Sequence, residues 1–325
     1  MLLFCLLFGG TEAVLRIIGY QPWKTEDRLI QVEPGGKFYT AHPTLGYTHI
    51  PGEFTVTLPS GYQFEVTHLP DTRRITHPLS TYAEGEQKAE IWVFGGSFTH
   101  GWTLNDEETY PWLLQERFPD YEVVNFGVSG HGTIHSLIQF RAALEAKQPV
   151  VAVLAYAGFH DERNTYLRSR RKGAAYWRRL GPLIQPYARL NDDGSLRYAV
   201  ADLDYCPFPL MEHLALAHVL ELAYNKLEYH IYRSHAVSEA IVADMAELAR
   251  ERGIQFIVAG ISAEPGTDAM LSFARRQGIP AVDIAVDLSI EGNSNRPHDA
   301  HPSALANRKY AERLAAFLAP SLPAD

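Results

Sequence analysis

The stretch Ile91-Trp-Val-Phe-Gly-Gly-Ser-Phe-Thr-His-Gly101 decides the fold of this 325-residue chain. Its first four residues are apolar with high strand propensity, and they run into two glycines and Ser97. A helix-like segment follows the next loop, so the pattern is typical of a buried parallel strand that ends on a turn. Ser97 is therefore predicted at the C-terminal tip of a strand, where open α/β sheets bind their ligands. Taken alone, Gly-Gly-Ser favours an ordinary turn that Ser97 only caps.

The segment Asp299-Ala300-His301-Pro302, near the C-terminus, changes this interpretation. It precedes a run with helical periodicity, so an acid and an imidazole are predicted in a loop that can reach across the crevice. A serine hydroxyl is a poor nucleophile unless an imidazole accepts its proton and a carboxylate orients the imidazole. The three residue types are present, although in an order unlike that of the Gly-x-Ser-x-Gly nucleophile elbow, which does not occur here.

Strand and helix patterns alternate from residue 91 to the C-terminus. The predicted strands are 91–94, 122–126, 150–156, 255–259 and 281–284, and the predicted helices are near 107–118, 134–146, 268–277 and 305–318. This alternation implies right-handed crossovers and an α/β fold with a parallel sheet covered on both faces.

Four separated motifs resemble those of the SGNH (GDSL-like) hydrolases. They are Gly95–Gly101, Asn125–Gly130, Gly158–Asp161 and Asp299–Pro302, and the resemblance covers roughly residue 90 to the C-terminus. It implies a flavodoxin-like parallel sheet with helices on both faces. The chain departs from the family pattern twice: Gly96 stands where an aspartate is usual, and His160 stands where the family has an oxyanion-hole asparagine.

The resemblance implies a role for each site residue. Ser97 would be the nucleophile, His301 its general base and Asp299 the group that orients His301. The N–H groups of Ser97 and Gly130 and the ring N–H of His160 would hold the oxyanion. We therefore predict a serine esterase acting on acyl esters, acetyl esters included, of a carbohydrate or lipid through an acyl-enzyme, with no cofactor and no metal.

Three other functions remain open at this point. An O-acyltransferase of envelope polysaccharide would use the same residues, and a non-catalytic glycan-binding pseudoenzyme is raised by His160 in place of asparagine. The third is a metal-dependent hydrolase. Its ligands would come from a set of histidines and two aspartates: His131, His135, His160, Asp161, His298, Asp299 and His301.

The first 88 residues differ in character from the rest. Residues 1–20 are mostly apolar, and we weigh two interpretations: the remnant of a signal anchor, or an amphipathic helix that docks on the domain. The first predicts a protein of the cell envelope or membrane, and the second a cytoplasmic one. Residues 21–88 predict a small β-rich extension, with a hairpin formed by 54–58 and 62–66.

Residues 89–325 form the predicted catalytic domain, with an insertion at about 162–235. The insertion opens with seven basic residues, Arg163, Arg168, Arg170, Arg171, Lys172, Arg178 and Arg179. Such a run is either a solvated face or a lid that contacts an anionic lipid surface or an acidic glycan. The net charge of −9 argues against nucleic acid as a partner.

Overall fold

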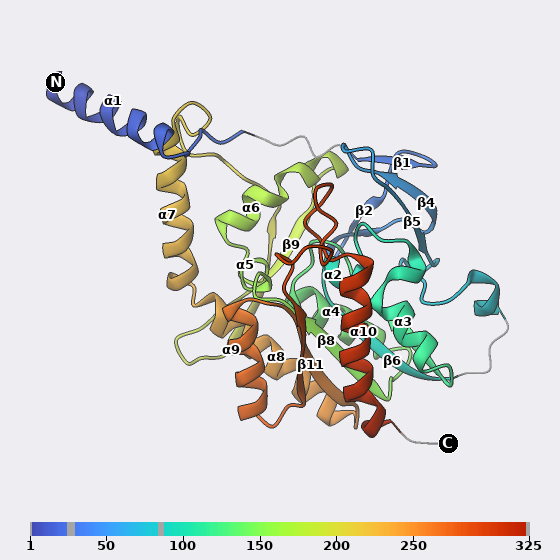
Figure 1. The fold of residues 1–325 in the computed structure, drawn as a ribbon. Coiled ribbons are helices and arrows are strands. Elements are labelled where there is room, and N and C mark those ends of the chain that lie inside the picture. Colours follow the sequence, from blue (N-terminus) through green and yellow to red (C-terminus); the bar gives the residue numbers. More distant parts are fainter. Residues whose placement is uncertain (1, 25–29, 84–87, 323–325) are drawn as a thin grey trace.

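A five-stranded parallel sheet forms the centre of the computed structural model, which describes residues 2–24, 30–83 and 88–322 (Figure 1). Its order is β12-β11-β8-β6-β7. The strands are β6 (Ala89–Phe94), β7 (Tyr121–Asn125), β8 (Val151–Tyr156), β11 (Gln255–Ser262) and β12 (Ala281–Val286). Counted along the chain this is the order 2-1-3-4-5, that of flavodoxin-like sheets. The predicted fold class is confirmed.

Helices cover both faces of this sheet, as predicted. Alternate residues of each strand point to opposite faces, so β6 sends Trp92 and Phe94 to one face and Ile91 and Val93 to the other. The first face packs against α4 (Thr133–Ala143), α8 (Ser234–Glu251) and α9 (Pro265–Arg276). The second packs against α3 (Tyr110–Arg117) and α10 (Ala304–Leu318).

The N-terminal extension consists of antiparallel strands beside the main sheet (Figure 1). The predicted hairpin is present as β4–β5, and β1 pairs with the outer edge of β4. The strands of the extension are β1 (Gln31–Glu33), β2 (Tyr39–His42), β3 (Gly46–His49), β4 (Gly52–Thr57) and β5 (Gln63–His68).

A buried arginine ties the extension to the loop that follows α2 (Ser97–His100). The side chain of Arg74 is fully buried and donates to the Asp106 carboxylate at 2.7 Å. It also donates to the carbonyl oxygens of His100, Gly101 and Leu104, at 2.9, 2.7 and 2.7 Å. A buried cation is tolerated only when it is paired and fully hydrogen-bonded, and both conditions hold here.

The insertion is more elaborate than the sequence predicts. It contains α5 (His160–Asn164), α6 (Arg168–Ala174), the 3₁₀ helix Ala175–Leu180, the hairpin β9 (Ile184–Leu190) with β10 (Leu196–Asp202), and α7 (Ala215–Ile231). The apolar pattern of residues 212–247 by itself predicts a single helical segment, but the structure has two helices there, α7 and α8. Arg233 between them has φ +50°, a left-handed conformation that a continuing α-helix does not allow.

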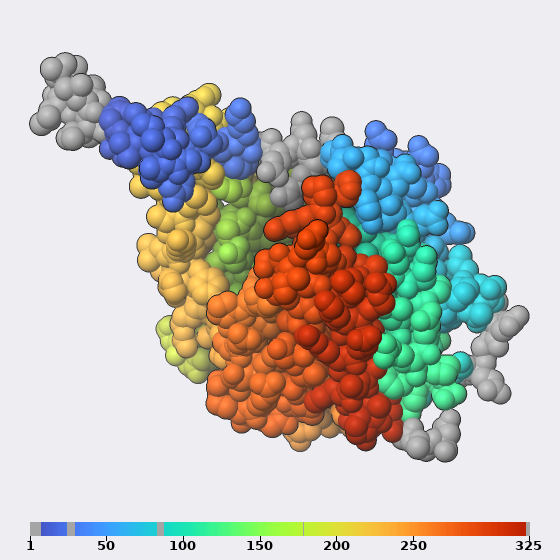
Figure 2. All heavy atoms as spheres, in the orientation of Figure 1, coloured from blue at the N-terminus to red at the C-terminus, as the bar shows by residue number. Residues whose placement is uncertain are grey.

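Helix α1 (Leu2–Ile17) lies against the N-terminal end of α7, at the side of the molecule away from the extension (Figures 1 and 2). The Glu12 carboxylate accepts from the backbone N–H groups of Ala215 and Leu216, both at 2.9 Å, and so caps α7. Within the described residues, no helix has the length and apolar character required to cross a bilayer.

Candidate active site

The structure brings Ser97, His301 and Asp299 into one hydrogen-bonded chain. Ser97 follows the Gly95-Gly96 turn at the end of β6 and begins the short helix α2. Its Oγ lies 2.9 Å from Nε2 of His301, whose Nδ1 lies 2.5 Å from Oδ1 of Asp299. The imidazole is therefore placed to take a proton from Ser97, in the geometry that nucleophilic catalysis by serine requires.

The local loop holds Asp299 as the anion that orients the imidazole. Burial opposes its ionisation, but hydrogen bonds from the ring and backbone N–H of His301, together with one from Trp102, outweigh burial and lower the pKa of Asp299. An ionised Asp299 keeps the proton of neutral His301 on Nδ1. The lone pair of Nε2 then faces Ser97.

A cavity of about 670 Å³ opens beside Ser97 between the extension, the insertion and the C-terminal loop. Gly130, the second predicted oxyanion donor, lines it together with Ser97, Asp299 and His301. Most of the remaining lining residues are aromatic, apolar or basic, and they include Tyr39, Trp102, Tyr176, Trp177, Arg163, Arg170 and Arg179. The arginines belong to the basic run, and no motif assigned them to the site; the side chain of Arg178 lies outside the described part.

Tyr47, from the extension, holds the peptide unit that carries the Gly130 N–H. Its fully buried side chain donates from the hydroxyl to the Ser129 carbonyl at 3.0 Å, and its ring stacks on Trp177 at 4.4 Å. Gly130 has φ +85°, and a Cβ there would lie 2.2 Å from the Tyr47 hydroxyl. The residue must therefore be glycine. Sequence reasoning missed Tyr47, because nothing local distinguishes it from other strand tyrosines.

We expect Tyr47→Phe to lower kcat by about tenfold with little change in KM. The Ser129–Gly130 peptide would lose its fixed orientation, whereas complete loss of an oxyanion donor costs about 10²–10³ in kcat. Steady-state kinetics on a 4-nitrophenyl ester measures the effect. Tyr166→Phe is the matched control, because the Tyr166 hydroxyl likewise donates to a carbonyl, that of Asp202 at 3.1 Å, within the insertion. Equal rates for both variants would contradict the positioning role.

His160 lies behind the nucleophile turn rather than in the wall of the cavity. The ring is buried, with Nδ1 3.5 Å from Oγ1 of Thr133 and Nε2 3.3 Å from the position of a Cβ on Gly96. Burial, followed by repulsion from Arg163, holds the pKa of His160 well below its ordinary value. The ring is therefore neutral at pH 7 and keeps one N–H donor.

Arg163 also occupies the space left open by Gly96. Its Nη1 lies 3.0 Å from the position of a Cβ on Gly96 and donates to the carbonyl of His131 at 2.7 Å. The absence of a side chain at residue 96 thus lets a cation reach the turn that carries Ser97. In the family that the chain resembles, this position usually carries an aspartate.

The histidines of the metal-dependent alternative do not gather around one point. His131 contacts the Tyr47 carbonyl at 3.1 Å and stacks on His135, while His298 stacks on Tyr62. In the part of the chain that the structure describes, the one group of metal-binding residue types close enough to share an ion consists of His49, His68 and His100.

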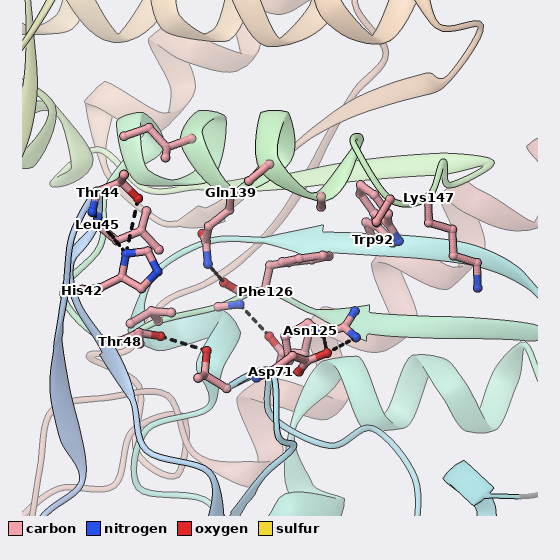
Figure 3. A pocket seen from close by; sticks show the side chains of 18 of the residues that line it. His42, Thr44, Leu45, Thr48, Asp71, Trp92, Asn125, Phe126, Gln139 and Lys147 are labelled. Atoms are coloured by element: carbon pink, nitrogen blue, oxygen red, sulfur yellow. Dashed lines mark hydrogen bonds and ion pairs between the residues drawn. The ribbon is translucent and has the colours of Figure 1, made fainter.

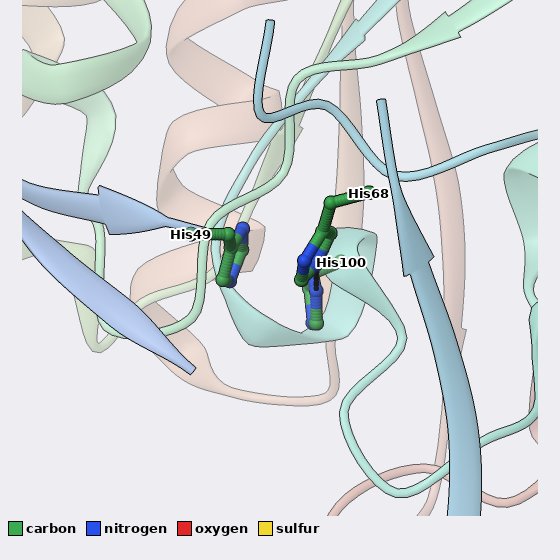
Figure 4. A group of neighbouring side chains, drawn as sticks. All are labelled: His49, His68 and His100. Carbon is green, nitrogen blue, oxygen red and sulfur yellow. Dashed lines mark hydrogen bonds between the residues drawn. The ribbon is translucent and has the colours of Figure 1, made fainter. Parts of the chain in front are cut away.

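That group is a stack of buried rings (Figure 4). His49 lies 4.3 Å from the ring of His68 and 4.1 Å from that of His100, at interplanar angles of 10° and 28°. Nε2 of His68 and Nε2 of His100 are 3.0 Å apart and share a hydrogen bond. Imidazole lone pairs lie in the plane of the ring. The ring of His49 is stacked on the other two, so its nitrogens do not point at the place between Nε2 of His68 and Nε2 of His100 where an ion would bind.

A second cavity, of about 530 Å³, lies between the extension and α4 (Figure 3). His42, Thr48 and Asp71 line it from the extension, and Trp92 and Phe126 line it from the sheet. It contains none of the predicted catalytic residues. The predicted catalytic residues Ser97, Asp299 and His301 instead line the cavity of about 670 Å³.

No protein-family model matches the chain, and no curated protein matches it. Among solved structures, the chain is similar to TesA, at 16% identity and a TM-score of 0.43 over 72% of this chain and 99% of TesA. It is similar to the psychrotrophic esterase EstA from Pseudoalteromonas sp., inhibited by monoethylphosphonate, at 10% identity and a TM-score of 0.42 over 72% and 98% of the two chains. It is also similar to a GDSL-like lipase from Bacteroides thetaiotaomicron VPI-5482, at 15% identity and a TM-score of 0.39 over 75% and 96%. Similarity at this level carries no information on substrate, and the fold assignment follows from the strand order of this chain.

Proposed function

We propose that the protein hydrolyses ester bonds through a covalent acyl-enzyme on Ser97. The observation that carries this proposal is the hydrogen-bonded chain from Ser97 through His301 to Asp299 at the wall of a cavity large enough for a small substrate. Acyl transfer requires a nucleophile, a base in contact with it and a group that orients the base.

In the first step the Ser97 oxygen attacks the ester carbonyl while Nε2 of His301 takes the hydroxyl proton. The resulting imidazolium is stabilised by Asp299, and it then gives the proton to the alcohol oxygen as the ester C–O bond breaks. In the second step His301 takes a proton from water, whose oxygen attacks the acyl carbon. The Ser97 oxygen leaves with the proton held on His301, which restores the free enzyme.

The oxyanion of each tetrahedral intermediate would be held by the N–H groups of Ser97 and Gly130, two residues that line the cavity. Fixed donors of this kind contribute strongly because they need no reorganisation during the reaction. We propose neutral His160, two residues beyond Gly158 in the third motif, as a side-chain donor in place of the asparagine of the family that the chain resembles. Because its ring lies behind the turn that carries Ser97 and not in the cavity wall, this role requires the turn to shift when substrate binds.

If His160 donates in this way, His160→Asn should retain most of the activity, because an amide also donates. His160→Ala should lower kcat by about 10²–10³, the effect of removing one oxyanion donor. Both variants are compared by steady-state kinetics at pH 7, with thermal melting to verify folding. An alanine variant as fast as the parent would remove His160 from the mechanism.

The experiment that tests the function combines turnover with covalent trapping. The full-length protein is assayed on 4-nitrophenyl esters of increasing acyl length and treated with a fluorophosphonate probe, whose phosphorus reacts with activated serine hydroxyls. We expect release of 4-nitrophenol and a label that peptide mass spectrometry assigns to Ser97. A label on another serine, or activity lost on treatment with EDTA rather than with the probe, would overturn the proposal.

We further propose that the acyl esters belong to a carbohydrate or lipid and that the protein associates with a membrane surface. Large apolar side chains are exposed along α1 and α7, on helices that lie against each other: Val14, Ile17, Leu220, Leu227 and Ile231. Large apolar side chains exposed on neighbouring helices are typical of surfaces that bind lipid or protein.

Fractionation of cells that express the tagged full-length chain measures this association. We expect the protein in the membrane fraction, and we expect a double variant, Leu227→Gln with Ile231→Gln, to move part of it into the soluble fraction. A matched pair of changes on α8, Glu247→Gln with Arg250→Gln, should have no effect, because these two exposed residues form an ion pair with each other and are not apolar. Recovery of the parent protein wholly in the soluble fraction would contradict the proposal.

A further inference from the structure

The cavity beside Ser97 carries an excess of positive charge. Three arginines line it, Arg163, Arg170 and Arg179, whereas its one carboxylate, Asp299, is already engaged by His301. Within the described residues, no salt bridge joins any of the three arginines to an acid, and the contacts of Arg163 and Arg170 are with carbonyl oxygens, an aromatic ring and a tyrosine hydroxyl.

The basic residues of helix α6 point in three directions, with Arg171 over the ring of Tyr166. Arg168 and Lys172 turn toward α7, where they bind the buried Glu221 carboxylate at 2.9 and 2.7 Å. Arg170 turns the other way, into the cavity, where it donates to the Gly130 carbonyl at 2.8 Å and the Tyr47 hydroxyl at 3.3 Å. The basic run is therefore not a uniform solvated face, because three of its members, Arg163, Arg170 and Arg179, line the cavity beside Ser97.

The arginines retain unused hydrogen-bonding capacity. A guanidinium has five N–H donors, and Nε of Arg170 is buried without a hydrogen-bond partner in the described structure. Burial, and to a smaller extent the neighbouring Arg170, lowers the pKa of Arg163 to about 9, so this residue stays cationic at pH 7. Two neighbouring guanidinium groups that have no acidic partner repel each other. An anion that binds to both of them offsets this repulsion and satisfies their free N–H donors.

From this placement we propose that the cavity binds esters that carry an anionic group, a carboxylate or a phosphate, with Arg163 and Arg170 contacting the anion and Arg179 at the exposed rim. The inference rests on the proposed esterase function and names its substrate class. Arginine suits this task because its planar fork matches the geometry of both anions. The aromatic walls of Trp102, Tyr176 and Trp177 would contact the uncharged remainder of the substrate.

Matched ester pairs test the inference by turnover. On the acyl side, 4-nitrophenyl hemisuccinate is compared with neutral 4-nitrophenyl 4-methylpentanoate. On the alcohol side, 4-acetoxybenzoate and 4-acetoxyphenyl phosphate are compared with neutral methyl 4-acetoxybenzoate. We expect kcat/KM for the anionic ester to exceed that of its neutral counterpart by about tenfold or more in at least one comparison, the effect of one charge-assisted contact. The comparison that shows it distinguishes carboxylate from phosphate.

Arginine variants distinguish a role in binding the anion from a role in positioning the Gly130 peptide. Arg170→Gln should lower the rates on all esters, because Arg170 also contacts Gly130, but it should bring the anionic-to-neutral ratio close to one. Arg163→Gln should reduce the same ratio. Arg171→Gln is the control, because Arg171 lies on the same helix over the ring of Tyr166, outside the cavity, and should leave the ratio unchanged.

Binding without turnover gives an independent result. Thermal melting of the full chain is followed with inorganic phosphate or succinate, against sodium chloride at equal ionic strength. We expect these anions to raise the Tm of the parent and of Arg171→Gln, and not that of the double variant Arg163→Gln with Arg170→Gln. The absence of a shift in the parent, or an equal shift in the double variant, would overturn the inference.

The two proposals fail in different ways. Ser97-dependent cleavage of neutral esters with no anionic preference in any comparison would overturn the substrate class and leave the esterase function standing. A phosphate or succinate shift that depends on the arginines, in a protein that cleaves none of the esters, would support the anion site and contradict the esterase.

Discussion

Ser97→Ala is expected to reduce ester hydrolysis by about 10⁶-fold in kcat, to the residual rate that binding and the oxyanion donors alone provide. The change removes the atom that forms the acyl-enzyme, so no other part of the site can compensate. The protein should melt at the same temperature as the parent, because among the described residues the Ser97 hydroxyl has His301 as its one hydrogen-bond partner. Burst and steady-state kinetics with 4-nitrophenyl acetate measure the loss.

A graded series makes this prediction sharper. His301→Ala should be nearly as severe as Ser97→Ala, whereas Asp299→Asn should cost about 10⁴-fold, because the base remains but its tautomer is no longer enforced. Ser136→Ala is the matched serine control. The Ser136 hydroxyl is buried in α4 and, within the described structure, has no hydrogen-bond partner, so its loss should leave kcat unchanged. A Ser97→Ala variant with more than a few per cent of parental activity would place the nucleophile elsewhere.

The free energy of unfolding is expected to fall steeply between pH 7 and pH 5. Six histidines are buried, at most 3% exposed, and burial lowers the pKa of each in the folded protein: His49, His68, His100, His131, His135 and His160. The largest group of them lies between the extension and α2, next to the nucleophile turn (Figure 4). Acid should therefore damage the site and the fold together.

The loss of stability at low pH follows from the difference in proton binding between the unfolded and the folded protein. The unfolded chain takes up these protons below its ordinary histidine pKa of 6.5, while the folded chain does not; the pKa of His68, for example, is about 3. Stability is therefore fully present above pH 6.5 and is lost as the pH falls toward the folded-state values. A histidine that stays neutral in the folded state costs about 2 kcal/mol at pH 5, so several together approach the total stability of an ordinary domain, about 5–15 kcal/mol.

One histidine, His235, stabilises the folded protein at low pH and so offsets a small part of this loss. A hydrogen bond to Asp161 raises the pKa of His235, so its contribution is fully present below pH 6.5 and is lost as the pH rises through the raised value. Urea denaturation at intervals from pH 8 to pH 5 measures the sum. A free energy of unfolding that stays constant from pH 7 to pH 5 would contradict the prediction.

His49→Phe isolates one member of the group. Both ring nitrogens of His49 lack hydrogen-bond partners among the described residues, so an apolar ring of similar shape should stabilise the protein. The substitution should also remove the uptake of one proton on unfolding. The free energy of unfolding would then depend less steeply on pH, by about 1.4 kcal/mol per pH unit below pH 6. The exposed His213, changed to glutamine, is the control and should leave the slope as it is.

Local patterns in the sequence were sufficient to predict the central sheet and the residues of the hydrogen-bonded array formed by Ser97, His301 and Asp299. The strand that ends at Phe94 has an apolar run, a glycine pair and a serine in direct succession, and Asp299 and His301 are two residues apart in one loop. Parallel strands present their C-terminal ends at one edge of the sheet, so chain order alone predicts that the four motifs meet there.

Only the tertiary structure determines which residues surround the hydrogen-bonded array of Ser97, His301 and Asp299. The sequence contains the basic run but does not say that Arg163 and Arg170 face Ser97 while Arg168 and Lys172 face Glu221, because that division depends on where α6 lies between the cavity and α7. It gives no sign that Tyr47 orients the Gly130 peptide from a separate strand. Contacts of this kind join residues far apart in the chain, and no local periodicity encodes them, because they form only when two elements pack.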